Sequence, residues 1–355
     1  MTGNHKRAIA VVCATLLAAA AVGTSAAAAG PARQARAVEG LDGPRGLDIA
    51  AGKTVVAESN GVISEVIRRG PDKGTTERIG KVVKGFGSAV AVAPNGDVWA
   101  LTGEGDARLF LFSDGDKRQV ADIGRFQKKQ NKDPFNLAEP AGQSNPFNLA
   151  AMADGSVLVA DAANNSVVHV TKRGKITPIA RVKPRVVEMP AGFDDPELPP
   201  PGTPLPSEAV VTSVAVGPDG TVYLGELRGF PGTPETSQIW KVRPGATDAV
   251  CKPNKPNKGA CTRFADGLTS IVALEMGRGG SLYVAELSKM SWLAAEFEVP
   301  GSEVGSIIRV GRDAQVRREL KPGKVILPGG IAVGGNGNVF VSGPVFGPGA
   351  IKKVG

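Results

Sequence analysis

The sequence has few of the residues that act as nucleophiles and proton carriers in enzymes. It contains two histidines among 355 residues, and His5 lies in the N-terminal leader described below. A Ser-His-Asp triad or a histidine-dependent lyase would therefore depend on His169, which lies in the strand-like segment SVVHVT, where we expect a structural role. G-x-S-x-G and P-loop motifs are absent, and no helix pattern follows the glycine-rich segment 334–337 to form a phosphate site.

Cysteine is also scarce. The chain has three cysteines, of which Cys13 belongs to the leader. Cys251 and Cys261 enclose the segment CKPNKPNKGAC, and in an oxidising compartment such a pair indicates a disulfide. A zinc site would need two more ligands, and His169 is the one histidine or cysteine that remains outside the leader. We therefore expect a disulfide that stiffens a surface loop.

Aromatic residues make up 5% of the chain, and its formal net charge of +8 is scattered rather than concentrated. A nucleic-acid surface would combine a dense basic stripe with stacking aromatic side chains. The sequence therefore argues against a nucleic-acid partner. We expect a monomer whose partner is an unknown small molecule or a polymer or protein of the cell envelope.

The first 29 residues have the pattern of a cleaved signal peptide. Lys6 and Arg7 precede an apolar run over residues 8–22, and small residues follow it, so cleavage is expected between Ala26 and Gly30. The apolar run is shorter than the roughly 20 residues that span a bilayer, which disfavours a membrane anchor. No later stretch is long and apolar enough to span a membrane. The sequence therefore predicts a secreted protein without a membrane span after cleavage.

One hairpin pattern recurs along the chain. Its clearest copy is VVTSVAVGPDGTVYLGELRGF, residues 210–230, in which two segments rich in β-branched residues flank a Pro-Asp-Gly turn. The turn glycines are Gly52, Gly96, Gly155, Gly220, Gly280 and Gly337, on average about 57 residues apart. A repeat of this length with about four strands predicts a β-propeller. We expect residues 30–355 to form an all-β, six-bladed β-propeller with four-stranded antiparallel blades.

The predicted blades lie near residues 40–80, 83–123, 144–182, 209–264, 265–320 and 324–355. The last blade contains only three strand patterns, so we expect residues 35–39 to supply its outer strand and close the ring. Four inserts should crowd one end of the channel, because their junctions lie on the same face of a propeller. These inserts are Arg125–Gln143, Lys183–Pro206, Phe230–Thr236 and Leu287–Glu303.

Acidic residues end the second strand of four predicted blades. Glu58, Asp161, Glu226 and Glu286 each follow an apolar run, and Arg45 and Asn148 begin neighbouring first strands. Strand equivalence places these residues near one end of the channel, where carboxylate and amide oxygens suit Ca²⁺. The alternative is a structural role for these acids, because acids at strand ends often accept hydrogen bonds from loop amides or pair with arginines such as Arg45 and Arg228. The sequence leaves both alternatives open.

Several motifs resemble one protein family. GLDGPRGLDIA, LVADAANNSVVHV and VTSVAVGPDGTVYLGELRGFPGTPETSQIWKV look like the ScyD/ScyE family of secreted bacterial proteins, from about Val38 to the C-terminus. That family is similar in fold to six-bladed NHL-type and gluconolactonase-type propellers. The resemblance implies the fold and supplies no settled activity, because propellers carry many functions.

Two function hypotheses follow from these patterns. The first is a non-catalytic binding or scaffold protein that uses the insert-rich face and needs no cofactor. The alternative is a Ca²⁺-dependent hydrolase or lactonase of gluconolactonase-like type, with Glu58, Asp161, Glu226 and Glu286 as metal ligands.

Overall fold

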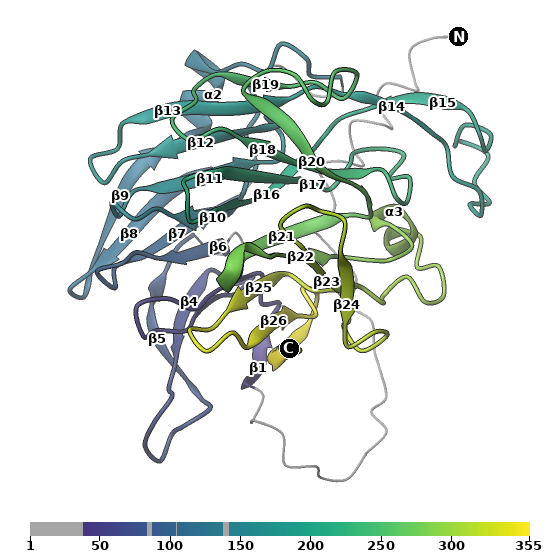
Figure 1. The fold of residues 1–355 in the computed structure, drawn as a ribbon. Helices are drawn as coiled ribbons and strands as arrows, with labels where there is room; N and C mark the ends of the chain where they lie inside the picture. Colours follow the sequence, from purple (N-terminus) through teal and green to yellow (C-terminus); the bar gives the residue numbers. More distant parts are fainter. Residues whose placement is uncertain (1–37, 84–86, 104, 138–141) are drawn as a thin grey trace.

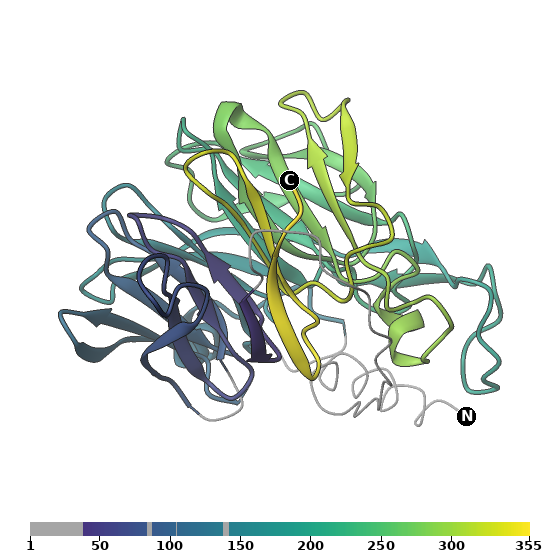
Figure 2. The same ribbon diagram turned by 90° about the horizontal axis from the view of Figure 1, so that it is seen from below.

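The computed structural model describes residues 38–83, 87–103, 105–137 and 142–355. The expected signal peptide and the first residues of the expected closing strand, 35–37, lie outside this part of the chain. The described residues form six small antiparallel sheets in a ring, which confirms the predicted β-propeller (Figures 1 and 2). The innermost strands of successive blades contact one another around the whole ring.

The strands of each blade follow one another from the axis outward. Blade 1 has β2 (Gly46–Asp48), β3 (Val55–Ala57), β4 (Val62–Val66) and β5 (Thr76–Lys81), and blade 2 has β6 (Gly87–Val92), β7 (Val98–Thr102), β8 (Arg108–Ser113) and β9 (Asp116–Asp122). Blade 3 has β10 (Pro146–Ala151), β11 (Val157–Asp161), β12 (Ser166–Val170) and β13 (Ile176–Val182), and blade 4 has β16 (Val211–Val216), β17 (Val222–Glu226), β18 (Ser237–Val242) and β20 (Cys261–Leu268). Blade 5 has β21 (Ile271–Met276), β22 (Leu282–Glu286), β23 (Ser306–Val310) and β24 (Arg317–Leu320).

The N-terminal strand closes the ring as predicted. Blade 6 contains β25 (Gly330–Val333), β26 (Val339–Gly343) and β27 (Pro348–Lys353), and its outer strand is β1 (Val38–Asp42) from the other end of the chain. Among the described residues the strand covers 38–42, and Val38 and Glu39 are the two residues of the predicted 35–39 that the structure describes. Val38 and Leu41 are the buried residues of this strand. They face the core, so their apolar side chains determine which residues of the segment form the strand.

The hairpin turns explain why the repeats fold as they do. All six predicted turn glycines have φ between 76° and 87°. This left-handed conformation strains residues that have a Cβ atom, so glycine lets the first two strands of each blade meet in a tight turn. The β-branched and aromatic side chains on both sides of each turn then pack between blades. Trp99 is fully buried and donates a hydrogen bond from Nε1 to the Gly155 carbonyl in the next blade, at 3.2 Å.

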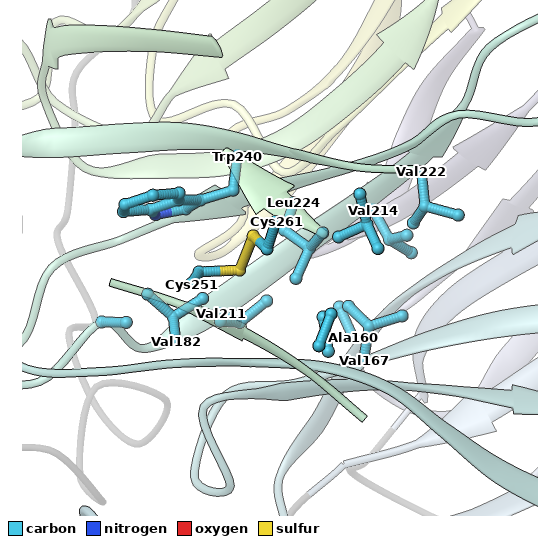
Figure 3. Packing of buried hydrophobic residues seen from close by; sticks show 14 of the residues in the cluster. Ala160, Val167, Val182, Val211, Val214, Val222, Leu224, Trp240, Cys251 and Cys261 are labelled. Atoms are coloured by element: carbon cyan, nitrogen blue, oxygen red, sulfur yellow. A yellow bond between two sulfur atoms is a disulfide. The ribbon is translucent and has the colours of Figure 1, made fainter. Parts of the chain in front are cut away.

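One strand leaves its own blade. After β18 of blade 4, β19 (Ala249–Cys251) pairs in parallel with β13, so blade 3 has a fifth strand. The chain then returns to β20, which extends beyond the expected end of blade 4 at residue 264. The predicted disulfide joins Cys251 in β19 to Cys261 in β20, and both cysteines are buried in the core cluster between the two blades (Figure 3). The disulfide therefore links blades 3 and 4 and also closes the largely exposed loop 252–260 that the sequence predicted it to stiffen.

The inserts gather at one end of the ring, which we call the insert face. It carries the short helices α2 (Ile123–Gln130) and α3 (Trp292–Glu296) and the separate hairpin β14 (Arg185–Glu188)–β15 (Pro204–Ser207), while the 3₁₀ turn η1 (Arg278–Gly280) lies in the β21–β22 turn at the other end. The hairpin extends beyond the blades on the same side as α3 in Figures 1 and 2. None of the described helices has the length and apolar character needed to cross a bilayer.

Candidate functional site

The acids predicted at the strand ends occupy equivalent positions on the insert face. Asp161, Glu226 and Glu286 each lie opposite the first residue of the inner strand, beside a one-residue bulge in that strand. Glu58 directly follows β3, and its backbone N–H donates to the Val62 carbonyl. The common register that the sequence predicted is therefore present.

Hydrogen bonds within and beside blade 3 occupy the carboxylate of Asp161. Its oxygens accept from Ser144 Oγ at 2.6 Å, from the Asn145 backbone N–H at 2.8 Å and from Gln127 Nε2 at 3.0 Å. Gln127 belongs to α2, so the insert helix is joined to blade 3 through this side chain. Burial raises the pKa of Asp161, and these donors partly offset the increase. The contacts favour a structural role for this acid.

Glu226 forms a buried ion pair with Arg228. The Trp240 indole Nε1 also donates to Glu226 Oε1 at 2.5 Å. Burial raises the pKa of Glu226, and the positive charge of Arg228 opposes this increase. Arg228 also donates to the carbonyls of Ser207 and Glu208, which lie at the end of the longest insert. This pair therefore connects blade 4 to that insert.

The remaining two strand-end acids also accept local hydrogen bonds. Glu286 accepts from the Thr269 N–H at 2.7 Å and from Ser306 Oγ at 2.6 Å, and Glu58 accepts from the Asp42 N–H at 2.7 Å. In the described part of the chain, no group of three or more His, Cys, Asp or Glu side chains is arranged to hold a metal ion. The four carboxylates do not fit a shared Ca²⁺ site in this arrangement, and we derive no chemical step from a cation. Their role as metal ligands stays a prediction, which melting in the presence of Ca²⁺ would test.

The other predicted residues lie nearby but do not join these acids. Asn148 Oδ1 accepts from the Val214 backbone N–H at 3.3 Å and so ties the inner strands of blades 3 and 4 together. Arg45 precedes β2 and is half-buried, and its Nε has no hydrogen-bond partner among the described residues. Burial lowers the pKa of Arg45, partly offset by Asp42. His169 lies in β12, where Nε2 is 2.7 Å from Ser156 Oγ, in agreement with the structural role expected for it.

A second pair of carboxyl groups, which was not predicted from the sequence, lies on inner strands of the ring. Asp48 ends the inner strand of blade 1, and Glu275 occupies the inner strand of blade 5. Blade 6 separates these two blades, yet the charge of Asp48 acts on Glu275, so the interaction runs across the ring. Asp48 Oδ2 accepts from the Val92 backbone N–H of blade 2 at 2.6 Å. Both residues are partly buried.

The two groups differ in their readiness to ionise. Burial raises the pKa of Asp48 to about 6, with backbone hydrogen bonds from Val92 and Ile49 limiting the increase. Burial raises the pKa of Glu275 well above its usual range, and the negative charge of Asp48 raises it further. Both groups therefore hold a proton to higher pH than free carboxyl groups do, and ionisation of one opposes ionisation of the other. Such a combination can accept one proton and donate another, which is the requirement for general acid–base catalysis.

A register signal could have revealed this pair. Asp48 and Glu275 pair with Val55 and Tyr283, which lie three residues before the strand-end acids of their blades. The same position in the other four blades is alanine. These residues are Ala91, Ala150, Ala215 and Ala332. Two acids in a ring of alanines stand out only when all six inner strands are aligned.

Comparison with known proteins shows the fold and no closer relationship. No protein-family model and no curated protein sequence matches the chain. Among solved structures, a gluconolactonase from Xanthomonas campestris has a TM-score of 0.55 at 13% identity, with 89% of this chain and 88% of that chain covered. A PQQ-bound aldose sugar dehydrogenase from Streptomyces coelicolor has a TM-score of 0.56 at 14% identity, with 90% and 97% covered. A glucose dehydrogenase has a TM-score of 0.58 at 15% identity, with 89% and 97% covered. The chain is thus similar to six-bladed propellers that include gluconolactonase-like and sugar dehydrogenase proteins.

Proposed function

We propose that this protein is a hydrolase of small cyclic esters, a lactonase, in which Asp48 and Glu275 carry the chemistry. The observation that carries the proposal is that two interacting carboxyl groups, Asp48 and Glu275, occupy the inner-strand position that is alanine in the other four blades. The likeness to a gluconolactonase structure supports the reaction class by analogy of fold alone. This proposal replaces the calcium-binding acids of the sequence hypothesis with a different pair.

The proposed reaction needs one base and one acid. Asp48 accepts a proton from water as the water oxygen forms a bond to the lactone carbonyl carbon. Glu275 donates its proton to the ring oxygen as the bond from that oxygen to the carbonyl carbon breaks, and the product is a hydroxy acid. The proton gained by Asp48 is lost to solvent, while Glu275 regains one from solvent. Val92 holds Asp48 in place through its backbone N–H, so the base is oriented before substrate arrives.

The test is hydrolysis of glucono-δ-lactone and of γ-butyrolactone by the purified chain, followed with a pH indicator in weak buffer, with Ca²⁺ or with a chelator. We expect Asp48→Asn and Glu275→Gln each to lower kcat by about 10²–10⁴-fold. Glu77→Gln, at an exposed position in β5, is the matched control and should keep full activity. The proposal is wrong if both lactones are hydrolysed at their uncatalysed rates in the presence of the wild-type chain. It is also wrong if Asp48→Asn and Glu275→Gln both stay fully active.

A second candidate function is a secreted binding or scaffold module, and the distribution of exposed apolar side chains favours it. Six of the seven exposed large hydrophobic residues in the described chain lie in connections on the insert face, and Val316 is the exception. Clustered apolar surface often marks a binding site. This second proposal includes the resemblance to the ScyD/ScyE family of secreted proteins and the cleaved signal peptide that export requires. Expression of the full chain in a bacterial host, followed by N-terminal sequencing of protein from the medium, tests export and cleavage between Ala26 and Gly30.

A further inference from the structure

The insert face above blades 4 and 5 has a charge opposite to that of the whole chain. It consists of three segments, residues 186–206, 229–236 and 288–305, which together contain eight acids and one lysine. Their formal charge is −7, although the complete chain has a formal charge of +8. We call this region the acidic insert surface. A charge difference of this size affects which molecules approach the surface.

Direct contacts join the three segments into one surface. The Thr233 hydroxyl donates to the Glu188 carbonyl at 2.6 Å, so the second segment touches the first. The rings of Phe193 and Phe297 meet edge to face, with centroids 5.3 Å apart, so the third segment also touches the first. The Trp292 indole donates to the Arg228 carbonyl at 2.7 Å and fixes α3 beside the second segment. Two hydrogen bonds and one ring contact therefore hold the three segments together, and the Trp292 hydrogen bond among them is buried.

Most acids of this surface are accessible, and no described residue forms an ion pair with them. Seven of the eight are exposed, and none of the described ion pairs includes any of the eight. The nearby cations are already engaged. Arg185 pairs with Asp266, Arg228 with Glu226 and Lys289 with Glu319. The negative charge is thus available to a partner from solution, although burial raises the pKa of Glu296 to about 7, so the charge of that acid is only partial at neutral pH.

Apolar side chains are exposed among these acids. Val186 is 65% exposed, and Phe297 is 43% exposed between Glu296 and Glu298. Met290 lies beside Lys289, whose N–H donates to the Val304 carbonyl, and Val304 bridges to Ile326 on the next segment. Met290 and Ile326 are each 40% exposed. Acids and apolar groups therefore alternate over adjoining segments.

From this complementarity we infer that the acidic insert surface docks a basic polypeptide segment in which lysine or arginine alternates with apolar residues. The inference rests on the second candidate function and names its partner. Cationic side chains would pair with Glu296, Glu298 and their neighbours, while apolar side chains cover Phe297 and Met290. Charge attraction speeds encounter and selects the partner, and apolar burial slows its release.

The probe is a fluorescein-labelled 14-residue peptide of alternating lysine and leucine, with a second peptide in which glutamate replaces lysine. Fluorescence anisotropy gives Kd at low and at high salt. The charge-reversal variant is Glu296→Lys with Glu298→Lys. The matched control reverses two exposed acids on the outer strands of blades 1 and 2, Glu77→Lys with Asp116→Lys. Phe297→Ser tests the apolar part.

We expect the lysine peptide to bind, with Kd raised about tenfold or more by Glu296→Lys/Glu298→Lys and by high salt, and within about twofold of wild type in the control. Phe297→Ser should also raise Kd. Equal weakening by the control, or no binding of the lysine peptide, overturns the inference. If the glutamate peptide binds as tightly and Phe297→Ser weakens it, the binding function stands and the charge-based partner is wrong. If sedimentation shows self-association that the charge reversal abolishes, the occupant is a second copy of the chain, which also overturns the inference.

Discussion

Val38 lies directly opposite Ile351, so a strand from the beginning of the propeller pairs with one at its end. Leu41 lies opposite Gly349 in the same pair of strands, and both Val38 and Leu41 are buried. The ring is therefore closed by hydrogen bonds and apolar contacts between segments more than 300 residues apart. Such a contact stabilises the closed ring by joining residues that are far apart in the sequence.

A chain that begins at Gly43 should lose this closure. Burial of Val38 and Leu41 alone contributes about 3–5 kcal/mol, so thermal melting should occur well below that of the intact propeller. A chain that begins at Val38 keeps β1 and serves as the control. Equal melting temperatures for the two chains would contradict the role of β1 in closing the ring.

Removing one partner of the Glu226–Arg228 pair should be more damaging than removing both. Glu226→Leu leaves the buried Arg228 charge uncompensated, which costs about 3–5 kcal/mol. The double variant Glu226→Leu/Arg228→Met should recover a substantial part of that loss, because no unpaired charge stays buried. Urea unfolding at pH 7 measures both free energies. Additive losses in the double variant would show that the two side chains act independently.

Calcium distinguishes the two roles considered for the strand-end acids. If Glu226 and Glu286 are structural, Ca²⁺ and chelator leave the melting temperature of the wild-type chain unchanged. Glu286→Gln lowers it, because the amide keeps one acceptor oxygen for the two donors, the Thr269 N–H and Ser306 Oγ. A bound cation would instead raise the melting temperature by mass action. Differential scanning fluorimetry over a range of Ca²⁺ concentrations is sufficient, and a saturable increase would restore the calcium-dependent hypothesis.

Stability should fall as pH rises because of the axial pair. Folding raises the pKa of Asp48 from 3.8 to about 6 and raises that of Glu275 further, so the folded state binds more protons than the unfolded chain. This part of the stability is fully present below about pH 4, and it is lost as pH rises through 6 and above. Glu275→Ala, which gives blade 5 the alanine found in four other blades, should stabilise the protein more at pH 8 than at pH 5. Unfolding free energies at pH 5 and pH 8 provide the check, and a gain of equal size at both would contradict it.

Breaking the disulfide should separate two blades. Cys251→Ser with Cys261→Ser removes a crosslink and places two hydroxyls in a buried apolar cluster, at a cost of about 2–5 kcal/mol. Hydrogen exchange should increase in β19 and in the facing edge of β13, and stay unchanged in blade 1. Uniform changes around the ring would indicate that the disulfide acts on the whole fold.

The parts of the fold that were predictable from sequence depend on local chemistry. Gly155 and Gly220 take the φ values that their turns require, and the apolar runs beside them form the expected strands. The route of β19 was not predictable, because Ala249–Cys251 pairs with a strand about 70 residues earlier through backbone hydrogen bonds that leave little pattern in the side chains. The axial pair was missed for a similar reason. Asp48 and Glu275 are acids on short apolar strands, and only the closed ring brings them together.

Strand β19 makes the junction between blades 3 and 4 different from the other junctions of the six-bladed ring. Blades 3 and 4 share a strand and a covalent bond in addition to the packing that joins neighbouring blades. If the propeller is opened by heat or by mechanical force, the break should begin at the blade 6 seam, where β1 is held without a crosslink. The two joined blades would then form the last folded remnant. Unfolding should therefore proceed from the blade 6 junction towards blades 3 and 4, an order that the symmetry of the six repeats does not suggest.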